Sequence, residues 1–126
     1  MSDLGELVNL EQRTISPRVF TDSDVYRAEQ ERVFGQCWLY VAHETQLPRP
    51  NDFVTSYMGE EPVIVCRDGQ GQVRVFINSC RHRGARVCRV DEGNTRTFQC
   101  PYHSWTYDMQ GRLVAFPSFK MPITVN

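Results

Sequence analysis

Two short segments that each carry one cysteine and one histidine constrain this chain more than any other feature. The first contains Cys80 and His82 in a Cys-x-His spacing, and the second contains Cys100 and His103 in a Cys-x-x-His spacing. Thiolate and imidazole are good ligands for soft and borderline transition metals. The fold is therefore expected to bring two loops together at a metal centre, with one sulfur and one nitrogen from each loop.

The order of the ligand types bears on which metal is bound. Zinc accepts two sulfurs and two nitrogens, but its usual patterns pair Cys with Cys and His with His. A two-iron cluster, in which one iron takes both thiolates and the other both imidazoles, matches one ligand of each kind per segment. The pattern favours a [2Fe–2S] cluster held by Cys80, His82, Cys100 and His103, with a structural zinc site as the alternative.

The remaining cysteines and the third histidine have simpler interpretations. Five cysteines are an odd number, and the chain shows no export signal, so a disulfide scaffold is not expected. Cys37, Cys66 and Cys88 are interpreted as small buried apolar residues. His43 is predicted to be a hydrogen-bonded scaffold residue.

Composition excludes several classes of function. The 126 residues are about the size of one domain, and 14 basic against 15 acidic residues give a net charge of −1. This balance argues against nucleic-acid and membrane-surface partners. No apolar run approaches the roughly 20 residues of a membrane span, and residues 1–6 lack the character of a signal peptide. We expect a soluble, cytoplasmic protein.

The first part of the chain differs in pattern from the rest. Residues 1–36 are expected to form an N-terminal extension, in which residues 1–20 are an extended or loosely docked lead-in. Residues 21–24 offer N-cap oxygens, and Gly35 is a suitable end for a helix at about residues 23–34.

From Cys37 onward the pattern is typical of short strands. Asp68-Gly69-Gln70-Gly71 predicts a hairpin turn, and residues 108–111 predict another. Short strands at close spacing predict a mainly β, antiparallel domain, with the two Cys/His loops at one tip of it. The expected strands cover residues 37–42, 53–58, 62–67, 73–77, 97–99, 105–107 and 112–115.

A known family carries the same pattern in two motifs, which are present as Cys80-Arg81-His82-Arg83-Gly84 and Cys100-Pro101-Tyr102-His103-Ser104-Trp105. These segments resemble the Rieske [2Fe–2S] motif. The resemblance is greatest to the large (α) subunits of bacterial aromatic-ring-hydroxylating dioxygenases of the biphenyl, benzene and phenylpropionate type, and it extends over about residues 17–117. It implies a Rieske-type antiparallel β sandwich over residues 37–119, with both cysteines on one iron and both histidines on the other.

The resemblance also implies an oxidoreductase that relays electrons. A ferredoxin or reductase would reduce the cluster, and mononuclear Fe(II) in a catalytic domain would receive the electrons, with a β subunit in a hetero-oligomer. That iron needs two histidines and a carboxylate, but only His43 remains once the cluster has taken two of the three histidines. We therefore expect an N-terminal fragment of an α subunit, catalytically incomplete alone. Its Rieske domain would lack the last strands, and residues 120–126 would be a truncated tail. A free-standing Rieske-type ferredoxin is the alternative.

A few positions distinguish the chain from other members of the family. Ser104 stands where α subunits usually have glycine. Respiratory Rieske proteins have disulfide-forming cysteines at the positions of Ala85 and Tyr102, and a serine at the position of Trp105. These differences imply a low-potential cluster. Trp105 and Tyr107 are interpreted as core or cluster-shielding aromatic residues.

One region is rich in arginine and has two interpretations. It forms a solvated loop face, or it is a docking patch for an acidic electron donor, since opposite charge raises the rate of encounter. The residues concerned are Arg81, Arg83, Arg86, Arg89 and Arg96.

Overall fold

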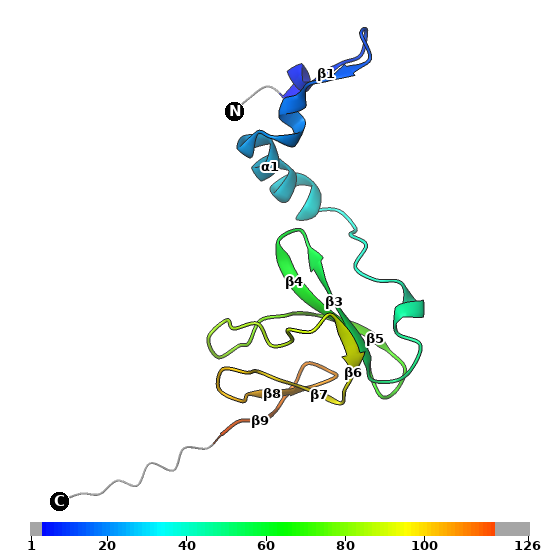
Figure 1. The fold of residues 1–126 in the computed structure, drawn as a ribbon, viewed down its shortest axis with the longest axis vertical. Helices are drawn as coiled ribbons and strands as arrows, with labels where there is room; N and C mark the ends of the chain where they lie inside the picture. Colours follow the sequence, from blue (N-terminus) through cyan, green and yellow to red (C-terminus); the bar gives the residue numbers. More distant parts are fainter. Residues whose placement is uncertain (1–3, 118–126) are drawn as a thin grey trace, which may run out of the picture. The chain divides into compact units, whose positions relative to one another are not determined.

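The computed structural model describes residues 4–117 (Figure 1). The chain divides into two compact units. The first comprises Met1–Tyr40 with Met58–Glu60, and the second comprises Val41–Tyr57 with Glu61–Asn126. The tail expected at residues 120–126 lies outside the described residues, as do the last two residues of the domain expected at 37–119.

The start of the first unit is folded into short local elements. Val8 pairs with Ile15 in an antiparallel ribbon, and the backbone N–H of Ser16 donates to the carbonyl of Leu7 at 2.8 Å. The side chain of Leu7 is buried. Of the two forms predicted for residues 1–20, the extended one is wrong for the described residues, because these backbone hydrogen bonds fold the segment locally. The loosely docked form stays a prediction. The elements are a 3-10 turn at Leu4–Leu7, β1 (Val8–Asn9), β2 (Thr14–Ile15) and a 3-10 turn at Pro17–Phe20.

The helix expected at residues 23–34 is confirmed, although its last turn is π-helical. α1 covers Ser23–Glu29, and the π-helical turn covers Gln30–Phe34. The side chain of Asp22 caps the start by accepting from the N–H of Asp24 at 2.9 Å. At the end, the N–H of Gly35 donates to the carbonyl of Gln30 at 2.9 Å. Sequence and structure agree on where this helix begins and ends.

The strand expected at residues 37–42 is wrong. These residues adopt no regular secondary structure. Trp38 and Tyr40 are exposed, and Cys37 is exposed rather than buried as expected. The preference of aromatic residues for strands depends on packing against a neighbouring strand. Residues 37–42 are paired with no such strand in the described part of the chain.

The second unit contains two antiparallel sheets and a 3-10 turn at Glu44–Gln46. One sheet has the order β5-β4-β3-β6 and the other the order β7-β8-β9. The mainly β, antiparallel fold expected from the sequence is confirmed. The strands are β3 (Asp52–Met58), β4 (Glu61–Arg67), β5 (Val73–Ile77), β6 (Glu92–Asn94), β7 (Thr97–Gln99), β8 (Thr106–Asp108) and β9 (Leu113–Ala115).

Strand β6 carries no strand signal in its sequence, and pairing explains its presence. Gly93 lies opposite Phe53 of β3. A Cβ atom on Gly93 would lie 3.0 Å from the Phe53 ring, so the absence of a side chain lets the ring cover the backbone. A glycine that weakens a strand in isolation thus permits this strand pair.

The two predicted hairpin turns are confirmed, and in both an aspartate side chain accepts from a backbone N–H two residues further on. In the first, Asp68 Oδ1 accepts from the N–H of Gln70 at 3.0 Å, and Asp68 Oδ2 accepts from Arg74 Nε at 2.8 Å. In the second, Asp108 Oδ1 accepts from the N–H of Gln110 at 2.9 Å. Each aspartate side chain adds to the backbone hydrogen bond that closes its turn, which the N–H of Gly71 donates to Asp68 and the N–H of Gly111 donates to Asp108, both at 3.0 Å. The two sets of bonds together fix the register of the strands that follow.

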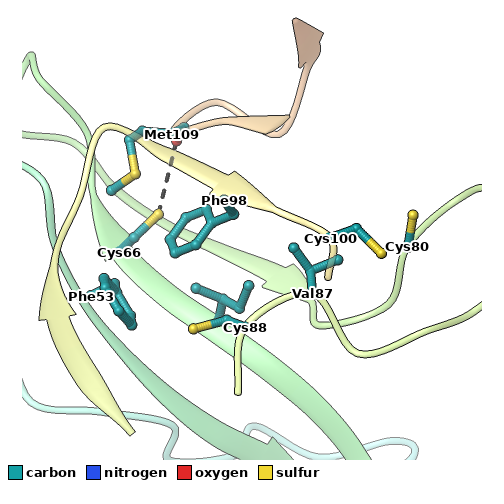
Figure 2. Close-up of a cluster of buried hydrophobic side chains, with 9 residues drawn as sticks. Phe53, Cys66, Cys80, Val87, Cys88, Phe98, Cys100 and Met109 are labelled. Carbon is teal, nitrogen blue, oxygen red and sulfur yellow. Dashed lines mark hydrogen bonds between the residues drawn. The ribbon is translucent and has the colours of Figure 1, made fainter. Parts of the chain in front are cut away.

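The main core cluster lies between the two sheets and includes both cysteines of the predicted motifs (Figure 2). The rings of Phe53 and Phe98 meet edge to face, with 5.2 Å between their centroids. Burying a large apolar side chain contributes about 1.5–3 kcal/mol. Cys80 and Cys100, one from each loop, therefore pack among side chains of both sheets. The cluster consists of Phe53, Ile64, Cys66, Cys80, Val87, Cys88, Phe98, Cys100 and Met109.

Candidate metal centre

The first Cys/His loop follows strand β5 and is closed by two backbone hydrogen bonds. The N–H of Cys80 donates to the carbonyl of Ala85, and the N–H of Gly84 donates to the carbonyl of Cys80, both at 2.8 Å. Gly84 has a φ of 70°, in the left-handed region that glycine adopts without strain. The loop thus turns back on itself within five residues.

The second loop follows strand β7 and repeats this arrangement. The N–H of Cys100 donates to the carbonyl of Trp105 at 2.8 Å, and the N–H of Ser104 donates to the carbonyl of Cys100 at 2.9 Å. Ser104 takes the position of the glycine in the first loop and has a φ of 58°. The substitution at this position therefore leaves the loop geometry intact, with backbone strain at a residue that has a side chain.

Asn78 fixes the first loop to the sheet, and the sequence analysis missed it. Its side chain is buried. Its Oδ1 accepts from the N–H groups of Val87 at 3.0 Å and Cys88 at 2.8 Å, and its Nδ2 donates to the carbonyl of Cys88 at 2.7 Å. An asparagine at the end of a strand, two residues before a predicted ligand, is the signal that could have indicated it.

The two predicted cysteine ligands lie side by side at one end of the core (Figure 2). Tyr107 Oη lies 3.2 Å from Cys80 Sγ. The same oxygen accepts from the N–H of Arg81 at 3.1 Å, which leaves the hydroxyl proton free to point at the sulfur. Tyr107, expected only as an apolar or shielding ring, thus supplies a polar contact to the site.

Opposing effects act on the Cys80 thiol. Burial acts to raise its pKa. Hydrogen bonds from the Tyr107 hydroxyl, the backbone of His82 and Arg83 and the neighbouring Cys100 outweigh burial, so the pKa is lowered. A lowered pKa favours the thiolate, which is the form that binds metal.

The two predicted histidine ligands also lie together, as a separate pair. The ring centroids of His82 and His103 are 4.7 Å apart. The ring of Trp105 stacks on that of His82 with an interplanar angle of 14°. The ring centroids of Tyr102 and His103 are 3.9 Å apart. His82 is exposed and His103 half-buried. Nδ1 of His103 is buried, with no hydrogen-bond partner among the described residues.

The other cysteines and the third histidine lie outside this group. Figure 2 shows Cys66 beside Met109 and the sulfur of Cys88 turned away from the Cys80–Cys100 pair. Burial raises the pKa of Cys66 to about 11, so this thiol stays protonated. His43 caps the turn at Glu44–Gln46 through a side chain that accepts from the N–H of Thr45. The predictions of buried cysteines at 66 and 88 and a scaffold histidine at 43 are confirmed.

These donors fit a cluster that takes its protein ligands in pairs. Within residues 4–117, no three or more His, Cys, Asp or Glu side chains converge on one ion position. A single tetrahedral zinc needs four such donors at one point, whereas each iron of a two-iron cluster needs only two. A buried ring nitrogen without a partner is costly, and a metal ligand bond would satisfy the one in His103.

Residues 37–124 match the family model of the Rieske [2Fe-2S] domain. The chain belongs to this family. The resemblance inferred from the two loop motifs is thereby confirmed, together with the [2Fe–2S] cluster as the cofactor of the domain.

Two similar relatives are α subunits of dioxygenases. The α subunit of biphenyl 2,3-dioxygenase from Rhodococcus jostii (strain RHA1) is 51% identical over 92% of this chain and 25% of its own length. The α subunit of benzene 1,2-dioxygenase from Pseudomonas putida is 48% identical over 92% of this chain and 26% of its own. The chain thus spans about a quarter of the length of these relatives.

A solved structure shows the same fold. Naphthalene 1,2-dioxygenase from a Rhodococcus species, crystallised with indole, superposes with a TM-score of 0.78 and 46% identity, covering 83% of this chain and 24% of that one. Among the described residues, the helices are too short and too polar to cross a membrane.

Proposed function

We propose that this Rieske domain relays single electrons within an aromatic-ring-hydroxylating dioxygenase α subunit. In this proposal Cys80 and Cys100 bind one iron of the cluster, and His82 and His103 bind the other. The observation that carries the proposal is the pairing of the donors: two sulfurs lie together in the core, and two imidazoles lie together on the loops. When bound, the cluster accepts and releases one electron.

The chain's own residues give the two ends of the site different environments. Cys80 and Cys100 are almost fully buried, so the sulfur end is shielded from water by the packed core. His82 is exposed, so the imidazole end is the short route by which electrons enter and leave. The hydroxyl of Tyr107 and the backbone N–H groups near Cys80 stabilise negative charge on the sulfur.

The electron acceptor in this proposal is a mononuclear Fe(II) site in another part of the α subunit. The chain has three histidines, and two are assigned to the cluster, so the residues present cannot supply a site of two histidines and a carboxylate. The relatives' names associate biphenyl and benzene with those proteins. An aromatic substrate, a ferredoxin or reductase as donor, and a β subunit in a hetero-oligomer complete the proposal.

Reconstitution with iron and sulfide tests the proposal. We expect two irons and two sulfides per chain and reversible reduction by one electron in a redox titration. Cys80→Ser and Cys100→Ser are expected to abolish cluster binding, because each removes one of the two thiolates on one iron. Cys37→Ser is the matched control, since this cysteine is exposed and lies outside the loops.

Two results would contradict this assignment. Purified protein that binds zinc tightly and takes up no iron would assign the loops to a structural zinc site. A cluster retained in full by Cys80→Ser but lost in Cys37→Ser would show that the sulfur ligands have been wrongly identified.

A further inference from the structure

The imidazole of His82 is oriented by contacts with other rings. The ring of Trp105 lies almost parallel to it, with 4.8 Å between the centroids, and the ring of His103 meets it edge to face. Among the described residues, no hydrogen bond to a ring nitrogen of His82 is observed. His82 is exposed, whereas His103 is half-buried. The more exposed of the two imidazoles is therefore the one whose plane is set by a side chain from the other loop.

Two contacts join the first loop to the segment around the start of strand β8, in a regular order. Tyr107 Oη lies 3.2 Å from Cys80 Sγ, and the ring of Trp105 stacks on that of His82. From the first contact to the second, one segment advances by two residues and the other goes back by two. Alternate side chains share a face of an extended segment, so the two contacts are related as neighbouring rungs of an antiparallel pair.

Trp105 is itself fixed by the second loop and by the core. Its side chain packs against the main core cluster. Its carbonyl accepts from the N–H of Cys100 at 2.8 Å, so its backbone takes part in closing the second loop. The ring of Phe116, which follows strand β9, has its centroid 6.2 Å from that of Trp105. A ring with these supports is a firm surface for an exposed neighbour to pack on.

His103 has a different support. The ring centroid 3.9 Å from its own belongs to Tyr102, its neighbour in the same loop. Its Nδ1 atom is buried. Removal of the Trp105 ring is therefore expected to affect His82 much more than His103, and this selectivity distinguishes a positioning role from general packing.

We propose that Trp105 is a positioning residue that orients the His82 imidazole for iron binding, both before the cluster is bound and afterwards. The inference rests on the proposed function, because it takes His82 as an iron ligand. Stacked aromatic rings attract one another beyond the effect of the area that they bury, so the flat indole face favours one plane of the imidazole. A ligand that is already oriented loses less conformational freedom on binding, so the cluster is held more firmly at its exposed end.

Nuclear magnetic resonance of the full chain without iron tests the positioning separately from cluster binding. We expect the ring protons of His82 to resonate upfield of those of His43, because they lie against an indole face. This upfield shift is expected to disappear in Trp105→Leu and to remain in part in Trp105→Phe, which keeps a flat ring. The signals are assigned with His43→Gln and His103→Gln.

Iron release from the reconstituted chain is the second measurement. In excess iron chelator, we expect the visible absorbance of the cluster to decay about fivefold faster in Trp105→Leu than in the wild type, and within about twofold of the wild-type rate in Trp105→Phe. The matched control is Trp38→Leu, which removes the chain's other tryptophan. The side chain of Trp38 is fully exposed, so the rate is expected to stay unchanged.

Pulsed EPR of the reduced cluster supplies the signature that a merely structural role would not give. With ¹⁵N-labelled histidine, we expect Trp105→Leu to change the coupling of one histidine nitrogen and to leave the other as in the wild type. If Trp105→Leu does not fold, as judged by circular dichroism, Trp105→Met replaces it in all three measurements.

The outcomes separate the two ways of failing. A wild-type chain that takes up no cluster would overturn the proposed function. An intact cluster spectrum without an upfield shift of His82 in the iron-free chain would overturn only the positioning role. Equal changes in the couplings of both histidines, or iron release from Trp105→Leu at the wild-type rate, would also overturn it and would assign Trp105 to general packing.

Discussion

At the scale of single residues, the hydroxyl of Tyr107 is the side-chain contact with the most direct effect on the proposed cluster. Its oxygen accepts from the N–H of Arg81 at 3.1 Å and lies 3.2 Å from Cys80 Sγ, so that towards a thiolate, which has no proton of its own, the hydroxyl is the donor. A hydrogen bond to a thiolate stabilises negative charge, so it favours the reduced state, which carries one more electron.

Tyr107→Phe is therefore expected to lower the reduction potential. A loss of about 1 kcal/mol of preference for the reduced state corresponds to about 40 mV for one electron. A redox titration followed by circular dichroism measures the shift. Tyr102→Phe serves as the control, because no hydrogen bond of that hydroxyl to another described residue is observed. A potential raised by Tyr107→Phe would contradict this account of the contact.

The fifth residue of each loop allows a second comparison. Ser104 and Gly84 both have positive φ angles, but only serine bears a Cβ atom, which is unfavourable in that region. Ser104→Gly is expected to raise the free energy of unfolding by up to about 1 kcal/mol, and Gly84→Ala to lower it by about 1 kcal/mol. A Cβ on Gly84 would have 3.9 Å to its nearest neighbour, Ser79 Oγ, so the cost is one of backbone conformation.

Urea unfolding of the two variants checks this pair of expectations. The backbone hydrogen bonds of the two loops match, so the two substitutions are expected to change the free energy of unfolding in opposite directions. If both substitutions changed the free energy of unfolding in the same direction, the left-handed backbone conformation would not be what decides which residue is favoured at these positions.

At the scale of elements, the aspartate turns hold the strands that position the loops. The pKa of Asp68 is lowered, chiefly by the hydrogen bond from Arg74 and next by the backbone N–H of Gln72. A carboxyl with a lower pKa in the folded state contributes stability above its unfolded pKa of about 3.9. That contribution is lost as the pH falls through the folded value.

Asp68→Asn is expected to lower the urea midpoint at pH 7, since the amide cannot form the ion pair with Arg74. Between pH 7 and pH 3 the wild-type midpoint is expected to fall more than that of the variant. If the urea midpoint fell equally in the two proteins, Asp68 would not contribute to the loss of stability at low pH.

The sequence alone predicts some elements well and others poorly, for physical reasons. The hairpin at Asp68 and the helix from Ser23 are determined by local chemistry, namely turn aspartates, caps and glycines, and both are confirmed. Strand β6 and the loop at residues 37–42 depend on long-range pairing. The sequence therefore predicted a strand at residues 37–42 that is not formed, and it gave no indication of strand β6.

The same distinction applies to the candidate site. Residue type and spacing were sufficient to nominate the four donors and to separate them from Cys66, Cys88 and His43. The contacts of Asn78 and Tyr107 join residues 10 and 27 positions apart, and local patterns carry no information about such contacts. Supporting residues such as Asn78 and Tyr107 were therefore missed, whereas the assignment of the four donors remains a prediction.

At the scale of the whole molecule, the second unit places a buried sulfur pair in the core and leaves His82 exposed and His103 half-buried. This polarity suits a domain that receives electrons on one face and protects the cluster on the other. The chain spans about a quarter of the α subunits that it resembles, and the electron acceptor is proposed to lie in the remainder of such a subunit.

The central claim, that two imidazoles and two thiolates hold one cluster, is tested most directly by pulsed EPR of the reduced protein with ¹⁵N-labelled histidine. The account predicts hyperfine couplings from two histidine nitrogens, which persist in His43→Gln and are reduced or lost in His82→Ala. A reduced cluster without nitrogen coupling, or one whose coupling disappears in His43→Gln and survives in His82→Ala, would contradict it.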